Sequence, residues 1–438
     1  MKELRVHKDG RFLETADGRP FFWMADTAWE LFHRLTREEI LLYLQKRSAQ
    51  GFNVVLAVAL AEVDGLRVPN RQGAYPLKKN KAGNFDPSLP DADGSDSYWD
   101  LVDYAFGEAE RQGIYLAFLP TWGDKYNASH WGKGPEVFDS KNAKVFGQWL
   151  GARYGKFKNL IWVLGGDRPL QTEHHFSVIR SLVEGIKSSG SQHLITFHPP
   201  GVSSSSLPFP DETWLDFHLT QTGHGTETTP HYEVLEKDYR LTKPKPVVEG
   251  ETNYEDHPIG FKAANGYFDQ VDVRRSSYWA LMAGSLGITY GHHCVWPMRT
   301  QADNLADPWS DNYFLMDWRT ALDRPGASQI RHMKTLFESR DFFSRVPDQS
   351  LVIKNFEGMN HIQACRGNGY AFVYLPNGIG VTVRLGVLGG KTLMARWFDP
   401  RLGTFVDYDN FPNTGERFFR PPLQGRDHDY VLVLDSQE

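Results

Sequence analysis

Cysteine is scarce in this chain of 438 residues, where Cys294 and Cys365 are the only two. A disulfide framework that replaces a hydrophobic core is therefore excluded. No run of 18 apolar residues occurs, so no membrane-spanning helix is expected. The net charge is −6, with acids and bases mixed along the chain. The broad basic face that nucleic acid requires is thus also missing.

Several catalytic motifs are missing as well. There is no Gly-x-Ser-x-Gly elbow for a serine nucleophile, and no His-x-His, His-Glu-x-x-His or cysteine ligand set. No metal or other cofactor is expected, with a metal at His198 or the His292-His293 pair as the weaker alternative. The first ten residues lack the apolar segment of a signal peptide. A cytoplasmic location is expected, or a secreted or periplasmic one if a leader has been removed.

Aromatic residues are abundant, with 13 Trp, 18 Tyr and 28 Phe. Such side chains fill large cores, and they also stack on the apolar faces of sugar rings. The overall composition, 40% hydrophobic and 23% charged, is typical of a soluble globular protein. The length suits one large domain and an appendage.

Short apolar runs and amphipathic segments alternate along the first 346 residues. Unbroken apolar runs are typical of strands that are covered on both faces. Strands are predicted at residues 20–26, 52–60, 114–119, 160–164, 194–197, 216–219, 246–248 and 287–290. Helices are predicted at residues 40–50, 98–112, 143–156, 174–188, 230–240, 271–283 and 329–342. The pattern predicts an α/β fold, a (β/α)8 TIM barrel over residues 1–346, with a β hairpin-like lead-in at residues 1–20.

The rhythm changes from residue 347 onward. Strands with turn residues between them are predicted at residues 351–353, 369–375, 380–385, 393–398 and 430–434. They predict a small antiparallel β-sandwich domain over residues 347–438. No low-complexity linker precedes it, so we expect this domain to pack tightly and to brace the barrel.

Polar and aromatic residues gather where the barrel strands end. They are Asp26, Trp29, Trp122, Asp124, Asp167, His198, Gln221, His224, Glu249, Glu251, His292, His293 and Trp296. Barrel enzymes place their chemistry at this end. Two acids for proton transfer, polar groups for hydroxyls and indoles for stacking suit the hydrolysis of a glycosidic bond.

Some of these residues have a second interpretation. Asp167 precedes Arg168 and Pro169 and could cap a helix, and Glu249 is better suited to an ion pair inside the barrel than to catalysis. Asp26 suits either a sugar hydroxyl or a structural partner.

Four motifs resemble glycoside hydrolase family 140, a bacterial family with a barrel and a C-terminal domain labelled collagen-binding. The motifs are Phe-Trp-Met-Ala-Asp-Thr-Ala-Trp (22–29), Trp-Val-Leu-Gly-Gly-Asp-Arg (162–168), Lys-Pro-Val-Val-Glu-Gly-Glu-Thr-Asn-Tyr-Glu (245–255) and Gly-His-His-Cys-Val-Trp (291–296). The resemblance implies an exo-acting, apiosidase-like hydrolase that releases a terminal sugar from plant pectin. By motif, Asp167 is similar to the acid/base and Glu251 to the nucleophile. Where related barrels have Asn-Glu, this chain has Gly-Gly-Asp, and Thr252 replaces an expected proline.

The resulting hypothesis is a retaining glycosidase with a carbohydrate substrate. Asp26, Trp29, Trp122, His198, Gln221, His224, His292 and Trp296 are its predicted substrate-binding residues. The alternatives are an endo-acting β-glucanase of the same barrel type and a non-catalytic carbohydrate-binding protein. Exo action predicts a pocket closed by the loop of residues 61–96.

Overall fold

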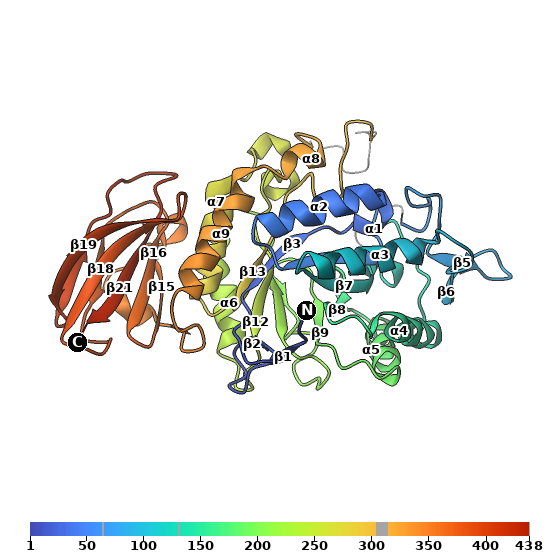
Figure 1. Cartoon of the computed structure of the whole chain (residues 1–438), viewed down its shortest axis with the longest axis horizontal. Coiled ribbons are helices and arrows are strands. Elements are labelled where there is room, and N and C mark those ends of the chain that lie inside the picture. The colour runs from blue at the N-terminus through green and yellow to red at the C-terminus, as the bar shows by residue number, and fades with distance from the viewer. Residues whose placement is uncertain (64, 130–131, 304–313, 438) are drawn as a thin grey trace.

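A barrel and a β domain make up the computed structural model, which describes residues 1–63, 65–129, 132–303 and 314–437 (Figure 1). The barrel sheet has the strand order β10-β11-β12-β13-β3-β4-β7-β8-β9 within those residues. Its parallel strands are β3 (Trp23–Thr27), β4 (Val54–Leu60), β7 (Tyr115–Thr121), β8 (Leu160–Gly165), β9 (Ile195–His198), β11 (His218–Gln221), β12 (Val247–Glu251) and β13 (Gly287–Tyr290). The short β10 (Ser203–Ser204) adds to β11 in the antiparallel sense.

Contacts between β9 and the residues before β11 complete the barrel. The Asp216 amide donates to the Ile195 carbonyl at 2.9 Å, and the Asp216 carboxylate accepts from the Ile195 amide at 2.7 Å. The Thr196 hydroxyl donates to the Phe217 carbonyl at 2.7 Å. The predicted TIM barrel is confirmed.

Both faces of the barrel strands are buried, which explains their unbroken apolar runs. In β4, Val54, Leu56 and Val58 belong to the cluster that fills the barrel interior. The intervening Val55 and Ala57 belong to the cluster that contains the side chains of the covering helices. Successive side chains of a strand point to opposite faces, so every position in β4 must be apolar.

Helices surround the sheet (Figure 1). They are α1 (Leu31–Arg34), α2 (Arg37–Ala49), α3 (Tyr98–Arg111), α4 (Ser140–Tyr154), α5 (Glu173–Ser188), α6 (His231–Tyr239), α7 (Gln270–Met282), α8 (Trp318–Ala321) and α9 (Pro325–Glu338). Thr36 caps α2 through the predicted capping box with Glu39. The last helix was predicted to begin at residue 329 but begins four residues earlier, at Pro325. A proline is favourable at the first helical position, where its missing N–H has no intrahelical partner to bind. The single turns α1 and α8 were not predicted.

The loop of residues 61–96 does not close the barrel mouth. It contains the hairpin β5 (Leu77–Lys79) and β6 (Phe85–Pro90), which projects away from the barrel at the right of Figure 1. At the N-terminus, β1 (Leu4–Val6) and β2 (Leu13–Thr15) form the predicted hairpin.

The C-terminal domain contains two antiparallel sheets. The larger has the order β14-β15-β16-β21-β18-β19, and the smaller pairs β17 with β20. The strands are β14 (Val346–Pro347), β15 (Gln363–Gly367), β16 (Tyr370–Leu375), β17 (Val381–Arg384), β18 (Thr392–Asp399), β19 (Thr404–Pro412), β20 (Glu416–Phe419) and β21 (Tyr430–Gln437). The strand predicted at residues 351–353 was wrong, since a 3-10 turn (Gln349–Leu351) and a single bridge from Val352 occupy this segment.

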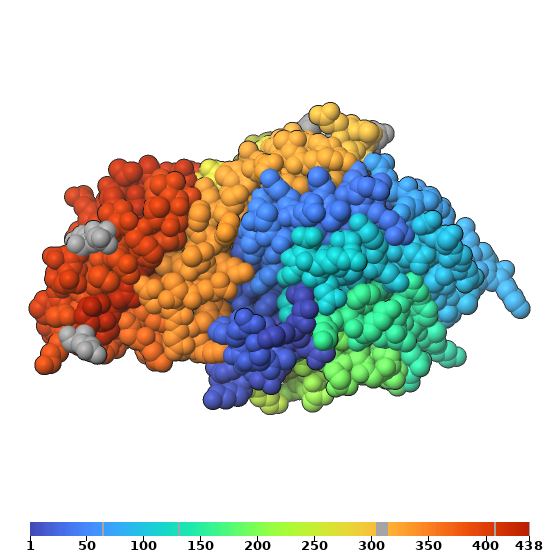
Figure 2. Space-filling model, in the orientation of Figure 1, coloured from blue at the N-terminus to red at the C-terminus, as the bar shows by residue number. Residues whose placement is uncertain are grey.

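Strand β16 shows how the larger sheet serves two cores. Val373 packs inside the β domain, whereas Phe372 and Tyr374 join the barrel cluster. The Tyr374 ring stacks on Tyr278 of α7, with centroids 4.7 Å apart, and Phe372 contacts Phe337 of α9. Helices α7 and α9 therefore lie between the barrel sheet and the β domain (Figure 1). In the space-filling view the β domain packs directly against the barrel (Figure 2).

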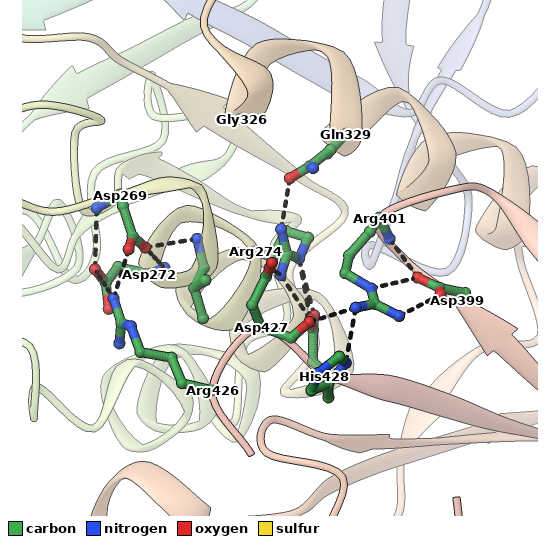
Figure 3. A network of polar contacts seen from close by, with 12 residues as sticks. Asp269, Asp272, Arg274, Gly326, Gln329, Asp399, Arg401, Arg426, Asp427 and His428 are labelled. Atoms are coloured by element: carbon green, nitrogen blue, oxygen red, sulfur yellow. Dashed lines mark hydrogen bonds and ion pairs between the residues drawn. The ribbon is translucent and has the colours of Figure 1, made fainter. Parts of the chain in front are cut away.

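Polar contacts reinforce this interface (Figure 3). The completely buried Arg274 of α7 donates to the equally buried Asp429 at 2.7 Å and to Asp427 at 2.7 Å. Nearer the surface, Arg426 donates to Asp269 and Asp272 at the start of α7 at 2.9 and 3.0 Å. The segment of residues 426–429 in the β domain thus binds α7 through one completely buried ion pair and one that is partly exposed.

Replacement of Arg274 should destabilise the whole chain. Arg274→Met leaves Asp429 buried without its cation, and breaking such a pair costs about 3–5 kcal/mol. Arg426→Met at the same interface is the matched control, because Arg426 is 48% exposed and should contribute no more than about 1 kcal/mol. Urea denaturation measures the free energy of unfolding of both variants. Equal decreases would contradict the larger contribution of the buried Arg274–Asp429 pair.

Candidate active site

A pocket of about 540 Å³ opens at the carboxyl ends of the barrel strands. Residues that follow every one of the parallel strands line it, from Trp29 after β3 to Trp296 after β13. Three acids, Glu62, Asp167 and Glu251, are among them. The site therefore lies where barrel enzymes carry their chemistry.

Asp167 reaches the pocket through a tight turn at the end of β8. Gly165 and Gly166 have φ angles of 95° and 113°, and Asp167 itself has a φ of 59°. A Cβ at Gly165 would lie 2.4 Å from the His198 carbonyl oxygen, and one at Gly166 would lie 2.6 Å from the Gly123 amide. Both glycines are thus required for the backbone to pass this close to its neighbours.

Burial and the nearby charge of Glu251 raise the pKa of Asp167 to about 7. Arg168 and His198 act in the opposite direction but do not outweigh burial. Asp167 therefore keeps a proton to near-neutral pH, as a general acid must.

Glu251 has the opposite protonation state. His198 Nε2 lies 3.2 Å from one carboxylate oxygen, and His224 Nε2 lies 3.1 Å from the other. Burial raises the pKa of Glu251, but the hydrogen bonds and charges of the two imidazoles lower it to about 2 in total. Glu251 is therefore ionised at neutral pH, opposite a protonated Asp167.

Glu249 lies behind Glu251 and does not line the pocket. Its Oε1 accepts hydrogen bonds from the Thr222 amide at 3.2 Å and the Glu251 amide at 3.1 Å. Burial raises its pKa to about 8. The acid is completely buried and supports the backbone of Glu251. Its role is therefore structural, but it rests on these amide hydrogen bonds and not on the ion pair that the sequence suggested.

Aromatic side chains form the walls beside the acids. Trp29 and Trp122 contact each other with ring centroids 4.9 Å apart, and Trp29 meets His198 edge to face. Trp122 Nε1 and Gln221 Oε1 are buried and have no hydrogen-bond partner among the described residues. Such groups can bind the hydroxyls of a ligand whose apolar face stacks on the indoles.

The structure brings most of the predicted site residues together. Trp29, Trp122, Asp167, Gln221, His224, Glu251 and Trp296 line the pocket. His198 lies directly behind Glu251 and is completely buried. Sequence reasoning missed Glu62, Tyr254, His257 and Phe261, which also line the pocket. Tyr254 belongs to the quoted Glu-Gly-Glu motif and Glu62 follows a predicted strand, so their positions carried a signal.

Asp26 does not reach the pocket. Its carboxylate accepts from Tyr43 Oη at 2.5 Å and from Arg47 Nε at 2.6 Å, and all three side chains are completely buried. Tyr43 and Arg47 belong to α2, so Asp26 faces the helix layer. The prediction that Asp26 binds substrate was therefore wrong, and its alternative, a structural role, is what the structure shows.

His292 is also a structural residue. Its Nε2 lies 3.0 Å from Asp256, and its Nδ1 accepts from the Cys294 amide at 3.0 Å. The neighbouring His293 lines the pocket instead and stacks on Phe314, with centroids 4.4 Å apart. In the described part of the chain, no group of three or more His, Cys, Asp or Glu residues could hold a metal ion.

Two carboxyl groups and indole walls at the rim of a barrel are an arrangement that suits a glycoside hydrolase. Residues 7–344 match the family model described as "Apiosidase-like, catalytic domain", and the chain belongs to this family. Residues 346–435 match the model "Putative collagen-binding domain of a collagenase". No curated protein matches the chain. None of the helices in the described ranges is long and apolar enough to cross a membrane.

Solved structures agree with this class. A glycoside hydrolase family 5 structure from Bacteroides vulgatus ATCC 8482 is 29% identical, with a TM-score of 0.90, over 99% of this chain and 93% of that one. A second structure, described as a glycoside hydrolase, is also 29% identical, with a TM-score of 0.88, over 100% and 97% of the two chains. The protein is therefore a glycosidase with a family-5-like barrel.

The raised pKa of Asp167 predicts that Asp167→Asn stabilises the protein at alkaline pH. A folded-state pKa of about 7 against 3.8 unfolded costs stability as pH rises between these values. The amide removes this cost, so its benefit should be roughly 3 kcal/mol greater at pH 8 than at pH 4. Urea denaturation at both pH values measures it.

Asp323→Asn is the control for this prediction, because Asp323 is exposed, does not line the pocket and makes its ion pair with Lys46 at the surface. It should change stability by less than about 0.5 kcal/mol at either pH. A pH-independent effect of Asp167→Asn would show that Asp167 does not titrate as an acid held protonated by burial.

Proposed function

We propose that this protein is an exo-acting, retaining glycosidase of glycoside hydrolase family 140. Its substrate would be a terminal apiose, or another pentose or furanose residue, on plant pectic glycans. The observation that carries the proposal is the pair Asp167 and Glu251, one protonated and one ionised, in a single pocket. The match to the apiosidase-like family supports the sugar class.

In the proposed reaction, Glu251 attacks the anomeric carbon while Asp167 protonates the departing glycosidic oxygen. Asp167 then takes a proton from a water molecule whose oxygen attacks the anomeric carbon, so that the bond to Glu251 breaks and the sugar leaves with net retention. The imidazoles of His198 and His224 suit a nucleophile that must stay ionised. The indoles of Trp29 and Trp122 line the pocket and suit stacking on a sugar ring.

The match to the apiosidase-like family supports exo action, although the loop of residues 61–96 does not close the pocket as that action predicted (Figure 1). Loops after every parallel strand contribute to the pocket wall. An endo-acting enzyme of the same barrel type would need a groove that a chain can cross.

A panel of aryl glycosides and pectic oligosaccharides tests the reaction. We expect release of a single terminal sugar, with the first anomer seen by proton NMR matching that of the substrate. Oligosaccharide products would indicate the endo-acting alternative, and an inverted first product would overturn retention. Binding without release of sugar would indicate a carbohydrate-binding protein.

Two substitutions in β12 test the assignment of the nucleophile. Glu251→Gln should lower kcat by about 10³-fold or more, because the covalent step loses its attacking carboxylate. Glu249→Gln is the matched control two residues away. Its amide oxygen can still accept from the Thr222 and Glu251 amides, so we expect less than a tenfold loss. Equal losses in kcat would show that the nucleophile is wrongly assigned.

A further inference from the structure

Glu62 is a third carboxylate in the pocket, and the reaction described above does not use it. It follows β4 at the barrel rim and is 8% exposed. Its Oε1 accepts a hydrogen bond from Arg168 Nη2 at 3.1 Å. The partner, Arg168, is the residue next to the acid Asp167.

The guanidinium of Arg168 faces both acids and is completely buried. Its Nη1 donates to the main-chain carbonyl of Asp167 at 3.0 Å, while the Asp167 carboxylate oxygen Oδ2 lies 3.6 Å away. Arg168 thus donates a side-chain hydrogen bond to Glu62 at 3.1 Å, whereas its contact with the Asp167 carboxylate is longer, at 3.6 Å.

The division of these contacts matters for acid catalysis. A cation close to a carboxylate favours the ionised form and lowers its pKa. A general acid needs the protonated form at the operating pH. If the guanidinium turned fully toward Asp167, it would remove the proton that the leaving group requires.

We propose that Glu62 is a positioning residue for the acid/base, which holds the Arg168 guanidinium to itself and offsets its charge so that Asp167 keeps its proton. The proposal rests on the role of Asp167 in the proposed function. Glu62 acts through Arg168 and does not itself donate or accept the proton that is transferred.

Other groups face these two acids and stay constant in a Glu62 variant. Asp167 is faced by Glu251 of β12, His198 of β9, Arg168, Tyr126 and Tyr254. Glu62 is faced by Arg168, Asp124, Lys125 and Glu30. Asp124 and Lys125 neutralise each other in a completely buried pair at 2.6 Å. Burial raises the pKa of Glu62, and Arg168 lowers it.

Carbon-13 NMR of protein labelled at the aspartate carboxyl carbons measures the midpoint of Asp167 without any substrate. The resonance lost in Asp167→Asn assigns the signal, and its midpoint should lie near the pKa of about 7. We expect Glu62→Gln to lower this midpoint by about one pH unit or more, because the variant removes the negative charge that offsets the Arg168 guanidinium beside Asp167. An unchanged midpoint in Glu62→Gln would overturn the proposal.

Three further variants keep the result decisive. Glu62→Asp retains the charge and should keep the midpoint closer to that of the native protein than Glu62→Gln does. Arg168→Met alone should raise the midpoint. In the Arg168→Met background, Glu62→Gln should shift it by less than half as much, since only direct repulsion remains. An equal shift in that background would show that Glu62 does not act through Arg168.

If Glu62→Gln does not fold, Glu62→Asp and Arg168→Met still decide the outcome. Arg168→Met must raise the midpoint, and a lower or unchanged midpoint would overturn the proposal. If the aryl glycosides are cleaved, the alkaline limb of kcat/KM should move down with the NMR midpoint in Glu62→Asp. Absence of all turnover would refute the proposed function and leave the titration result standing.

Discussion

The ionised carboxylate of Glu251, held between two imidazoles, is the interaction on which the site depends. A buried charge without partners is too costly to maintain, so His198 and His224 are needed wherever Glu251 remains charged. The three residues come from β9, the loop after β11, and β12. They meet only because the segment that begins at Asp216 pairs with β9 and completes the barrel. The charge state of the site is thus a consequence of barrel closure.

Asp167 responds to burial in the opposite way, by staying protonated. Within the described part of the chain no pair of imidazoles holds it. Burial and the charge of Glu251 both oppose its ionisation, so it retains a proton. The tight turn through Gly165 and Gly166 gives Asp167 a positive φ, which is costly for a residue with a side chain. Two acids of similar intrinsic pKa therefore acquire different protonation states from their surroundings alone, as the proposed reaction requires.

The sequence allowed the barrel to be predicted because burial on both faces leaves an unbroken apolar run at each strand. It also located the rim, since each run ends at a definite residue. It could not show the direction of each side chain there. Asp26 is at the end of β3 yet points to Arg47 in the helix layer, and His292 turns inward while His293 reaches the pocket. A shift of one residue along a strand moves a side chain from one face of the sheet to the other. A single sequence does not determine the position to within one residue.

The β domain contributes to the same unit without lining the pocket. Among the described residues, none beyond Phe314 lines it. Yet Asp272 of α7 accepts from Arg426 of the β domain and also from Arg275, at 2.7 Å. Arg275 in turn donates to the Glu227 carbonyl at 3.1 Å, in the loop that carries His224. Helix α7 thus connects the β domain to the loop that carries His224. The β domain can therefore brace the barrel without binding a ligand, because its contacts with α7 support the loop that places the His224 imidazole against Glu251.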